Sequence, residues 1–226
     1  MMKPFYLTHC PPRAPTFYRL LRVSLLVLSA VACNAPALAQ TVNPTPDTRL
    51  THSPDSAQQR LALMGIDVTA ERLVQYAAQG DSNVLALLLQ AGLDVNAVDA
   101  QRRVSALHNA AAQGHVRIIK TLLERGAKID ALDWYGNTPL INAAWYGQPE
   151  AVKLLLASGA QVNSVSNQGQ SALTAAIYSG KVELVRSLLA QGADPTLPAS
   201  LNALRVAELA GRTNMVQAIQ QRMEQK

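Results

Sequence analysis

Histidine is the residue type in this chain best suited to acid–base or metal chemistry. His108 and His115 lie seven positions apart, and His52 lies in a stretch rich in Pro, Ser and Thr. No second metal ligand accompanies His108 at a useful spacing, and a metalloprotease helix, a nucleophile elbow and a phosphate loop are all absent from the sequence. We therefore predict no catalytic residue, no metal site and no cofactor. An enzyme that uses His108 or His115 is the third alternative.

Aromatic side chains are the second group that could act, by binding. Beyond residue 39 there is no Phe, and four of the six aromatic residues fall between positions 134 and 146. Tyr and Trp are the residues most enriched among interface hot spots. The six are Tyr76, Trp134, Tyr135, Trp145, Tyr146 and Tyr178.

The first 39 residues have the features of a secretory signal. They contain four basic residues and no acidic one, then the apolar run 23–32 and the small–x–small pattern Ala37-Leu38-Ala39. We predict a signal peptide over 1–39 that is cleaved before Gln40. The alternatives are a lipoprotein signal that ends at Cys33 and a mitochondrial presequence. A ten-residue run is too short to span a bilayer, so we expect no stable membrane insertion after cleavage.

Removing this segment changes the charge and the thiol content. The chain carries a net charge of +5, but residues 40–226 keep 16 of the 20 basic residues and all 15 acidic ones. A nearly neutral protein lacks the basic surface that binds phosphate backbones, so we predict no nucleic-acid partner. Both cysteines, Cys10 and Cys33, lie in the segment. We expect a periplasmic or secreted protein without disulfides.

An internal repeat of 33 or 34 residues sets the fold. Two series of glycines keep this step, and they are Gly80, Gly114, Gly147 and Gly180, and Gly92, Gly126, Gly159 and Gly192. A period of this length indicates stacked supersecondary units. Such a stack presents a long side surface and no central pocket, which favours binding over catalysis.

Each unit contains two predicted helices. The first has leucine followed three or four residues later by alanine, as in Leu107…Ala110 and Leu140…Ala143, and the second is rich in Leu, Ile and Val. Glycine after the second helix suits a left-handed cap. We divide the chain into the signal (1–39), a flexible lead-in (40–54), an N-terminal capping helix (55–66), four repeats with a shortened C-terminal cap (67–219) and a polar tail (220–226).

The best unit, Asn137-Thr138-Pro139-Leu140…Ala143-Ala144…Gly147…Gly159-Ala160, closely resembles the ankyrin repeat. Ser105-Ala106-Leu107-His108 is a second good copy. The resemblance covers about residues 67–219 and implies an all-α solenoid of helix-turn-helix units joined by β-hairpin-like turns. It also implies non-catalytic binding of another protein through a concave groove. His108 would then form structural hydrogen bonds between repeats.

In that family the columns that hold most of the aromatic residues vary and line the groove. We therefore predict a partner-binding site of aromatic residues with a polar rim. Its residues are Trp134, Tyr135, Trp145, Tyr146, Tyr178, Arg102, Asn137 and Gln168. Trp145→Ala is expected to weaken binding and to leave stability nearly unchanged.

Two alternatives concern the aromatic residues, and one concerns the basic pair. The rings could pack on each other and stiffen the scaffold, or they could form a stacking platform for a glycan or small molecule. Arg102 and Arg103 form either a solvated turn or a contact for an acidic rim. We expect a monomer whose partner is a protein of the cell envelope, which it restrains or scaffolds.

Overall fold

The computed structural model describes residues 54–197 and 202–224. These residues belong to one compact unit, 45–226. The predicted signal peptide, residues 40–53 of the lead-in and both cysteines lie outside the described residues.

Eleven α-helices make up the regular structure of the described part. They are α1 (Pro54–Leu63), α2 (Ala70–Gln79), α3 (Ser82–Gln90), α4 (Ala106–Gln113), α5 (Val116–Glu124), α6 (Pro139–Trp145), α7 (Pro149–Ala157), α8 (Ala172–Ser179), α9 (Val182–Ala190), α10 (Ala203–Leu209) and α11 (Thr213–Glu224). The β-structure in this part is confined to two isolated antiparallel bridges, Val98–Ser105 and Val165–Ser171. The prediction of an all-α repeat solenoid is confirmed. None of the described helices is both long and apolar enough to cross a bilayer.

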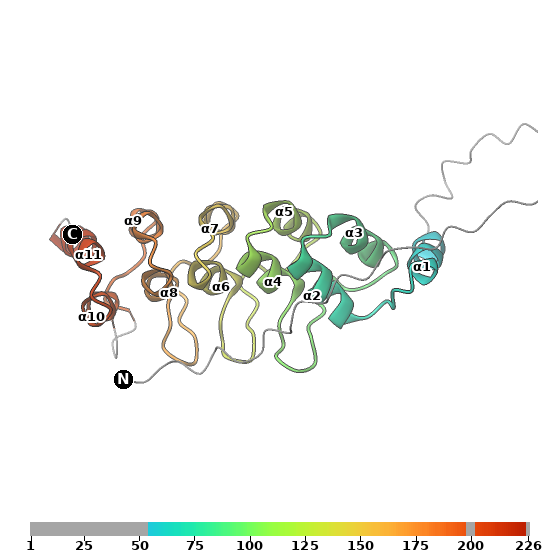
Figure 1. Ribbon diagram of the computed structural model, residues 1–226, viewed down its shortest axis with the longest axis horizontal. Helices are drawn as coiled ribbons and strands as arrows, with labels where there is room; N and C mark the ends of the chain where they lie inside the picture. Colours follow the sequence, from blue (N-terminus) through green and yellow to red (C-terminus); the bar gives the residue numbers. More distant parts are fainter. Residues whose placement is uncertain (1–53, 198–201, 225–226) are drawn as a thin grey trace, which may run out of the picture. The chain divides into compact units, whose positions relative to one another are not determined.

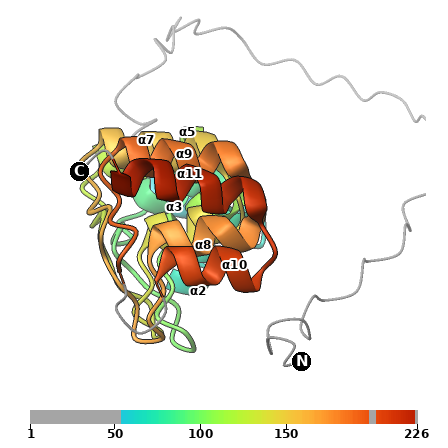
Figure 2. The same ribbon diagram turned by 90° about the vertical axis from the view of Figure 1, so that its left-hand side faces the viewer.

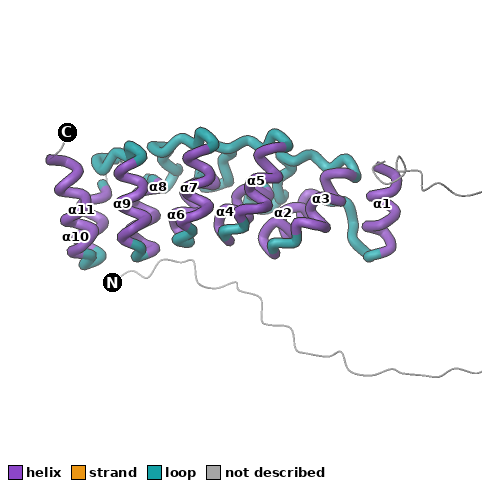
Figure 3. The backbone as a smooth tube through the Cα atoms, turned by 90° about the horizontal axis from the view of Figure 1, so that it is seen from above, coloured by secondary structure: helices purple, strands orange, loops and turns teal. Residues whose placement is uncertain are grey.

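The helices form two layers along the stack (Figures 1 and 2). The first helices of the units, α2, α4, α6, α8 and α10, pack side by side in that order. The second helices, α3, α5, α7, α9 and α11, form the other row, and α1 packs beside α3 (Figure 3). The loops that join successive units extend from one side of the stack (Figures 1 and 2).

The leucine and alanine columns make up the interior between units. Leu73, Leu107, Leu140 and Leu173 are each at most 1% exposed. The neighbouring alanines are buried as well, and their small side chains allow the first helices to approach closely. The core is therefore a continuous row of contacts between neighbours, as expected of a solenoid.

Hydroxyl and amide side chains begin the first helices. Thr69, Ser105, Thr138, Ser171 and Asn202 each accept a hydrogen bond from a backbone N–H in the first turn. These bonds satisfy donors that have no partner inside the helix. The start of each first helix is thus fixed by its own sequence, and so is the direction of the hairpin that precedes it.

A polar side chain from each following unit reaches the C-terminal end of a first helix. Nε2 of His115 donates to the Ala78 carbonyl at 3.0 Å, and Nε2 of Gln148 donates to the Ala112 carbonyl at 3.2 Å. Lys181 donates from Nζ to the Gly147 carbonyl. Carbonyls at helix ends lack helical partners, so these bonds tie successive repeats together. His115 therefore has a structural role.

Three hairpins join the central repeats, and we number them by sequence: the first (98–105), the second (132–138) and the third (165–171). In the second hairpin, Oδ1 of Asp133 accepts from the N–H groups of Tyr135 and Asn137, both at 2.8 Å. Trp134 N–H donates to the Arg102 carbonyl and Asn167 N–H to the Tyr135 carbonyl, both at 2.9 Å. The backbones of the three hairpins are thereby linked in series.

Glycine is required at the tip of the second hairpin. Gly136 has φ +74°, and a Cβ there would lie 2.9 Å from the backbone N of Asn167 in the third hairpin. In the first hairpin Arg103 adopts the corresponding left-handed conformation, with φ 54°. Six positions separate Asp99 from Ser105, whereas five separate Asp133 from Thr138. This additional residue accounts for the single step of 34 in a repeat of 33.

The two ends of the array differ from the boundaries predicted from the sequence. The capping helix α1 begins at Pro54, since proline is tolerated in a first turn, where the backbone N–H has no helical partner. At the other end α11 continues to Glu224, so the array does not end at residue 219. Residues 220–224 of the predicted tail are the last turn of this helix, because α11 keeps packing on α9 and α10.

Candidate functional site

The aromatic residues come from three neighbouring elements. Trp134 and Tyr135 lie at the tip of the second hairpin, and Trp145 and Tyr146 lie at the end of α6. Tyr178 lies near the end of α8. Four of them are exposed, with fractions of 64% for Trp134, 41% for Tyr135, 59% for Tyr146 and 47% for Tyr178. These four side chains are accessible to a partner.

The aromatic residues form two groups and not one crowded patch. Helix α6 has seven residues and is about 10 Å long, so its two ends are well separated. Trp134 and Tyr135 precede this helix, and Trp145 and Tyr146 end it. At the latter end the rings of Trp145 and Tyr178 are in contact, with centroids 5.2 Å apart and planes tilted by 44°. The helix-end group therefore spans two repeats.

Trp145 is less accessible than the sequence suggested. Its side chain is half-buried and packs against the hydrophobic core as well as on Tyr178. Removing the indole would open a gap beside the core, so the expectation that Trp145→Ala leaves stability nearly unchanged is wrong on physical grounds. Trp134 and Tyr146 are the better positions for testing binding, because their rings are mostly exposed.

The three polar residues of the predicted site have different environments. Arg102 is exposed on the first hairpin, and its Nε lies 3.7 Å from Oδ2 of Asp99. Asn137 is half-buried, and its side chain donates to Oδ2 of Asp133 at 3.1 Å, so it mainly holds the second hairpin together. Gln168 is exposed at the tip of the third hairpin.

The structure adds a row of exposed aliphatic side chains that we did not predict. Val98, Leu132 and Val165 occupy the same position in the three hairpins, directly before Asp99, Asp133 and Ser166, and they are 39%, 58% and 41% exposed. The signal in the sequence was their repeated spacing of 34 and 33 residues. Exposed apolar side chains that recur over neighbouring units extend the candidate site along the hairpins.

His108 lies beneath the second hairpin and is fully buried. Its Nδ1 accepts from the Ser105 N–H at 3.2 Å, and its Nε2 lies 3.0 Å from the Asn137 carbonyl oxygen, which can only accept. The proton therefore lies on Nε2. Burial lowers the pKa of the imidazole below its usual value, and the hydrogen bond to Asn137 and the charge of Asp133 only partly oppose this. His108 is a neutral link between repeats.

Family comparison agrees with this arrangement of helices and hairpins. A family model for three copies of the ankyrin repeat matches residues 73–166, and a model for a single ankyrin repeat matches residues 168–200. The chain is an ankyrin-repeat protein. No curated protein matches the sequence.

Membership of the family agrees with the chemistry of the site. Ankyrin repeats are generally protein–protein interaction modules and are typically non-catalytic. Over residues 54–197 and 202–224, no group of three or more His, Cys, Asp and Glu residues could hold a metal ion. The surface offers side chains for recognition and no arrangement of an acid, a base and a nucleophile.

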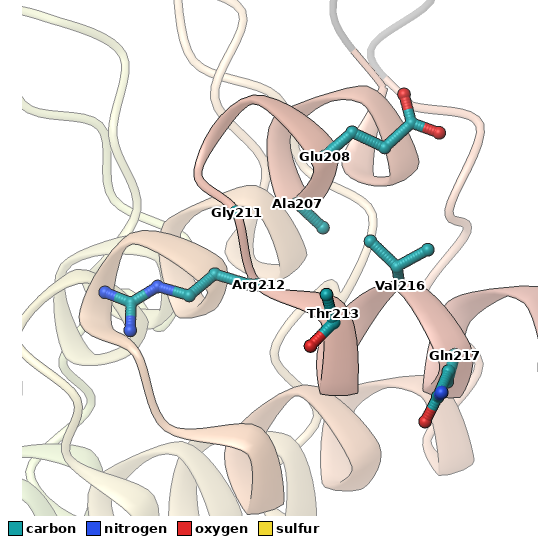
Figure 4. Close-up of a pocket in the computed structure, with 7 residues that line it drawn as sticks. All are labelled: Ala207, Glu208, Gly211, Arg212, Thr213, Val216 and Gln217. Carbon is teal, nitrogen blue, oxygen red and sulfur yellow. The ribbon is translucent and has the colours of Figure 1, made fainter.

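A hollow of about 400 Å³ lies at the C-terminal end of the stack, between α10 and α11. Ala207 and Val216 point toward each other across it, and the guanidinium of Arg212 extends away from it (Figure 4). The array ends here, so the hollow has no following repeat to cover it. It is lined by residues 207–217, far along the stack from the second hairpin, and is not part of the aromatic site.

Proposed function

We propose that this ankyrin-repeat protein is exported and binds another protein of the cell envelope through the aromatic and aliphatic side chains of its hairpins and helix ends. The observation that supports this most is the extent of the exposed apolar surface. Val98, Leu132 and Val165 recur on three hairpins, with Trp134 and Tyr135 beside them and Tyr146 and Tyr178 at the helix ends. A surface that spans several repeats suits a protein better than a small ligand.

The same surface suits tight binding for an energetic reason. The hairpins are held in series by backbone hydrogen bonds, and the helices beneath them share one continuous core. A preformed surface loses little conformational entropy on docking, so apolar area buried by the aromatic rings contributes directly to affinity. Restraint or scaffolding of the partner would both follow from such occupancy.

A capture experiment tests this surface. The full chain carrying Trp134→Ala and Tyr146→Ala is compared with the parent chain as bait in an extract of the native envelope. Both rings are mostly exposed, so the variant is expected to stay folded and to bind the captured protein at least tenfold more weakly, a loss of about 1.4 kcal/mol.

The matched control changes two exposed residues of the other layer, Arg117→Ala and Lys120→Ala on α5. These side chains lie on a second helix, away from the hairpins, so capture is expected to be unchanged. Equal capture by the aromatic variant and the parent chain would refute the proposed surface. Capture that soluble glycans abolish would favour the alternative in which Trp145 and Tyr178 stack on a sugar.

Export has a separate test, based on the N-terminal sequence features. If the signal is cleaved after Ala39, the protein recovered from the envelope should begin at Gln40 and contain no cysteine. Intact mass measurement decides this directly. A lipid-modified chain beginning at Cys33, or an unprocessed chain in the cytoplasm, would contradict the proposed route.

A further inference from the structure

Two arginines line a hollow in the layer of second helices, away from the hairpins. Arg186 lies on α9 and Arg222 on α11, and the space between them has a volume of about 340 Å³. The other lining residues are Leu189, Ala190, Ala218 and Gln221. No acidic residue lines this hollow. Two positive groups thus face one space whose lining carries no negative group.

Neither arginine is neutralised by another described residue. The ion pairs in the described part of the chain join Arg102 to Asp99 and Arg205 to Glu208. Nε of Arg222 is enclosed and has no hydrogen-bond partner among the described residues. An enclosed N–H of a charged group that lacks an acceptor is costly, and the cost is removed when an acceptor enters.

The chemistry of the guanidinium specifies the missing acceptor. Its N–H groups form a planar fork that binds two oxygens of one oxyanion, and such charge-assisted bonds are stronger than neutral ones. A phosphate group carries close to two negative charges at pH 7 and matches two facing guanidinium groups. Gln221 adds an amide donor to the same lining.

One feature of the hollow opposes an anion. Ala190 is the last residue of α9, and the end of a helix carries a partial negative charge from its free carbonyls. This partial charge is smaller than the two full charges of the arginines. The balance favours an anion, although the open position of Arg186 at the surface makes binding sensitive to salt.

We propose that the hollow between α9 and α11 binds an oxyanion of the phosphate type, held between Arg186 and Arg222. The site is separate from the aromatic surface and does not depend on the protein partner. Its ligand is either free phosphate or the phosphate group of a monoester.

Titration of the full chain with inorganic phosphate tests this site. Ionic strength is kept constant with chloride, and the backbone amide shifts of Ala218 and Gln221 are followed by NMR. Saturable changes are expected with phosphate, and the apparent affinity should fall at least fivefold in Arg186→Gln and in Arg222→Gln. The control Arg205→Gln, an exposed arginine of α10 that pairs with Glu208, should bind phosphate like the parent chain.

Two further arms complete the experiment. Tighter binding of glycerol phosphate than of inorganic phosphate would identify a monoester as the ligand, and equal or weaker binding would identify the free ion. Arg222→Lys keeps the charge and loses the planar fork, so it should bind more weakly even if Arg222→Gln does not fold. Shifts that do not saturate, or unchanged affinity in Arg186→Gln, would overturn the proposal.

Discussion

Replacing Leu140 by alanine is expected to lower the free energy of unfolding by about 2–5 kcal/mol. Leu140 is completely buried in α6, the central first helix, which packs on α4 on one side and on α8 on the other. Truncation leaves a cavity between repeats that rigid neighbouring helices fill only in part. Urea denaturation followed by circular dichroism measures the change.

The matched control for this prediction is Leu132→Ala. Leu132 lies only eight positions earlier, and its side chain is 58% exposed on the second hairpin. Surface substitutions of this kind usually change stability by less than about 0.5 kcal/mol. A similar loss of stability in the two variants would mean that the leucine column is not the interface between repeats.

The order of the helices was predictable from the sequence because one column of residues has the same role in every unit. Leu107, Leu140 and Leu173 are buried to the same degree, and the helix that holds each of them begins after a Ser or Thr that accepts a backbone hydrogen bond. Local capping and inter-repeat packing therefore specify the same boundaries. Agreement between the local and the tertiary signal is what makes a repeat easy to identify.

The ends of the array were less predictable because their neighbours differ. Helix α11 packs on α9 and α10 without a following repeat, and its polar sequence gave no sign that it continues to Glu224. Leu209 is 67% exposed on α10, which is where an additional repeat would pack. An apolar residue at an end is covered only if another element packs there, and the repeat pattern does not contain that information.

The candidate site was predictable as a set of columns but not as a set of exposures. Trp145 and Tyr146 are adjacent in the sequence, yet one is half-buried and the other mostly exposed. The difference comes from the neighbouring repeat, which places Tyr178 against Trp145. Contacts of this kind depend on side-chain directions across a repeat boundary, and a single sequence does not specify those.

His108→Ala is expected to lower the free energy of unfolding by about 2–5 kcal/mol. The change leaves the Ser105 N–H and the Asn137 carbonyl without their present partner, and each unsatisfied buried group costs about 1–3 kcal/mol. Because Asn137 belongs to the second hairpin, the Trp134 N–H that bonds to Arg102 should also exchange faster with solvent. Denaturation and hydrogen exchange measure the two effects.

Thr174→Ala is the matched control, because Thr174 occupies the same position in its repeat. Oγ1 of Thr174 accepts from the Ser171 N–H at 2.9 Å, but its side-chain hydrogen bonds all remain with Ser171. Thr174→Ala thus removes the local bond alone. A stability loss no larger in His108→Ala than in Thr174→Ala would show that the bond from His108 to the second hairpin contributes little.

The pH dependence of stability gives a second measure of the same buried imidazole. Burial lowers the pKa of His108 in the folded protein, so below about pH 6.5 the unfolded chain binds a proton that the folded chain excludes. Stability contributed in this way is complete above pH 6.5 and is lost as the pH falls toward the lowered pKa. His108→Gln should remove this part of the acid sensitivity, while His115, which stays partly exposed, remains in both proteins. An unchanged pH profile in the variant would mean that the imidazole is protonated as readily inside the fold as outside it, which its two hydrogen bonds do not permit.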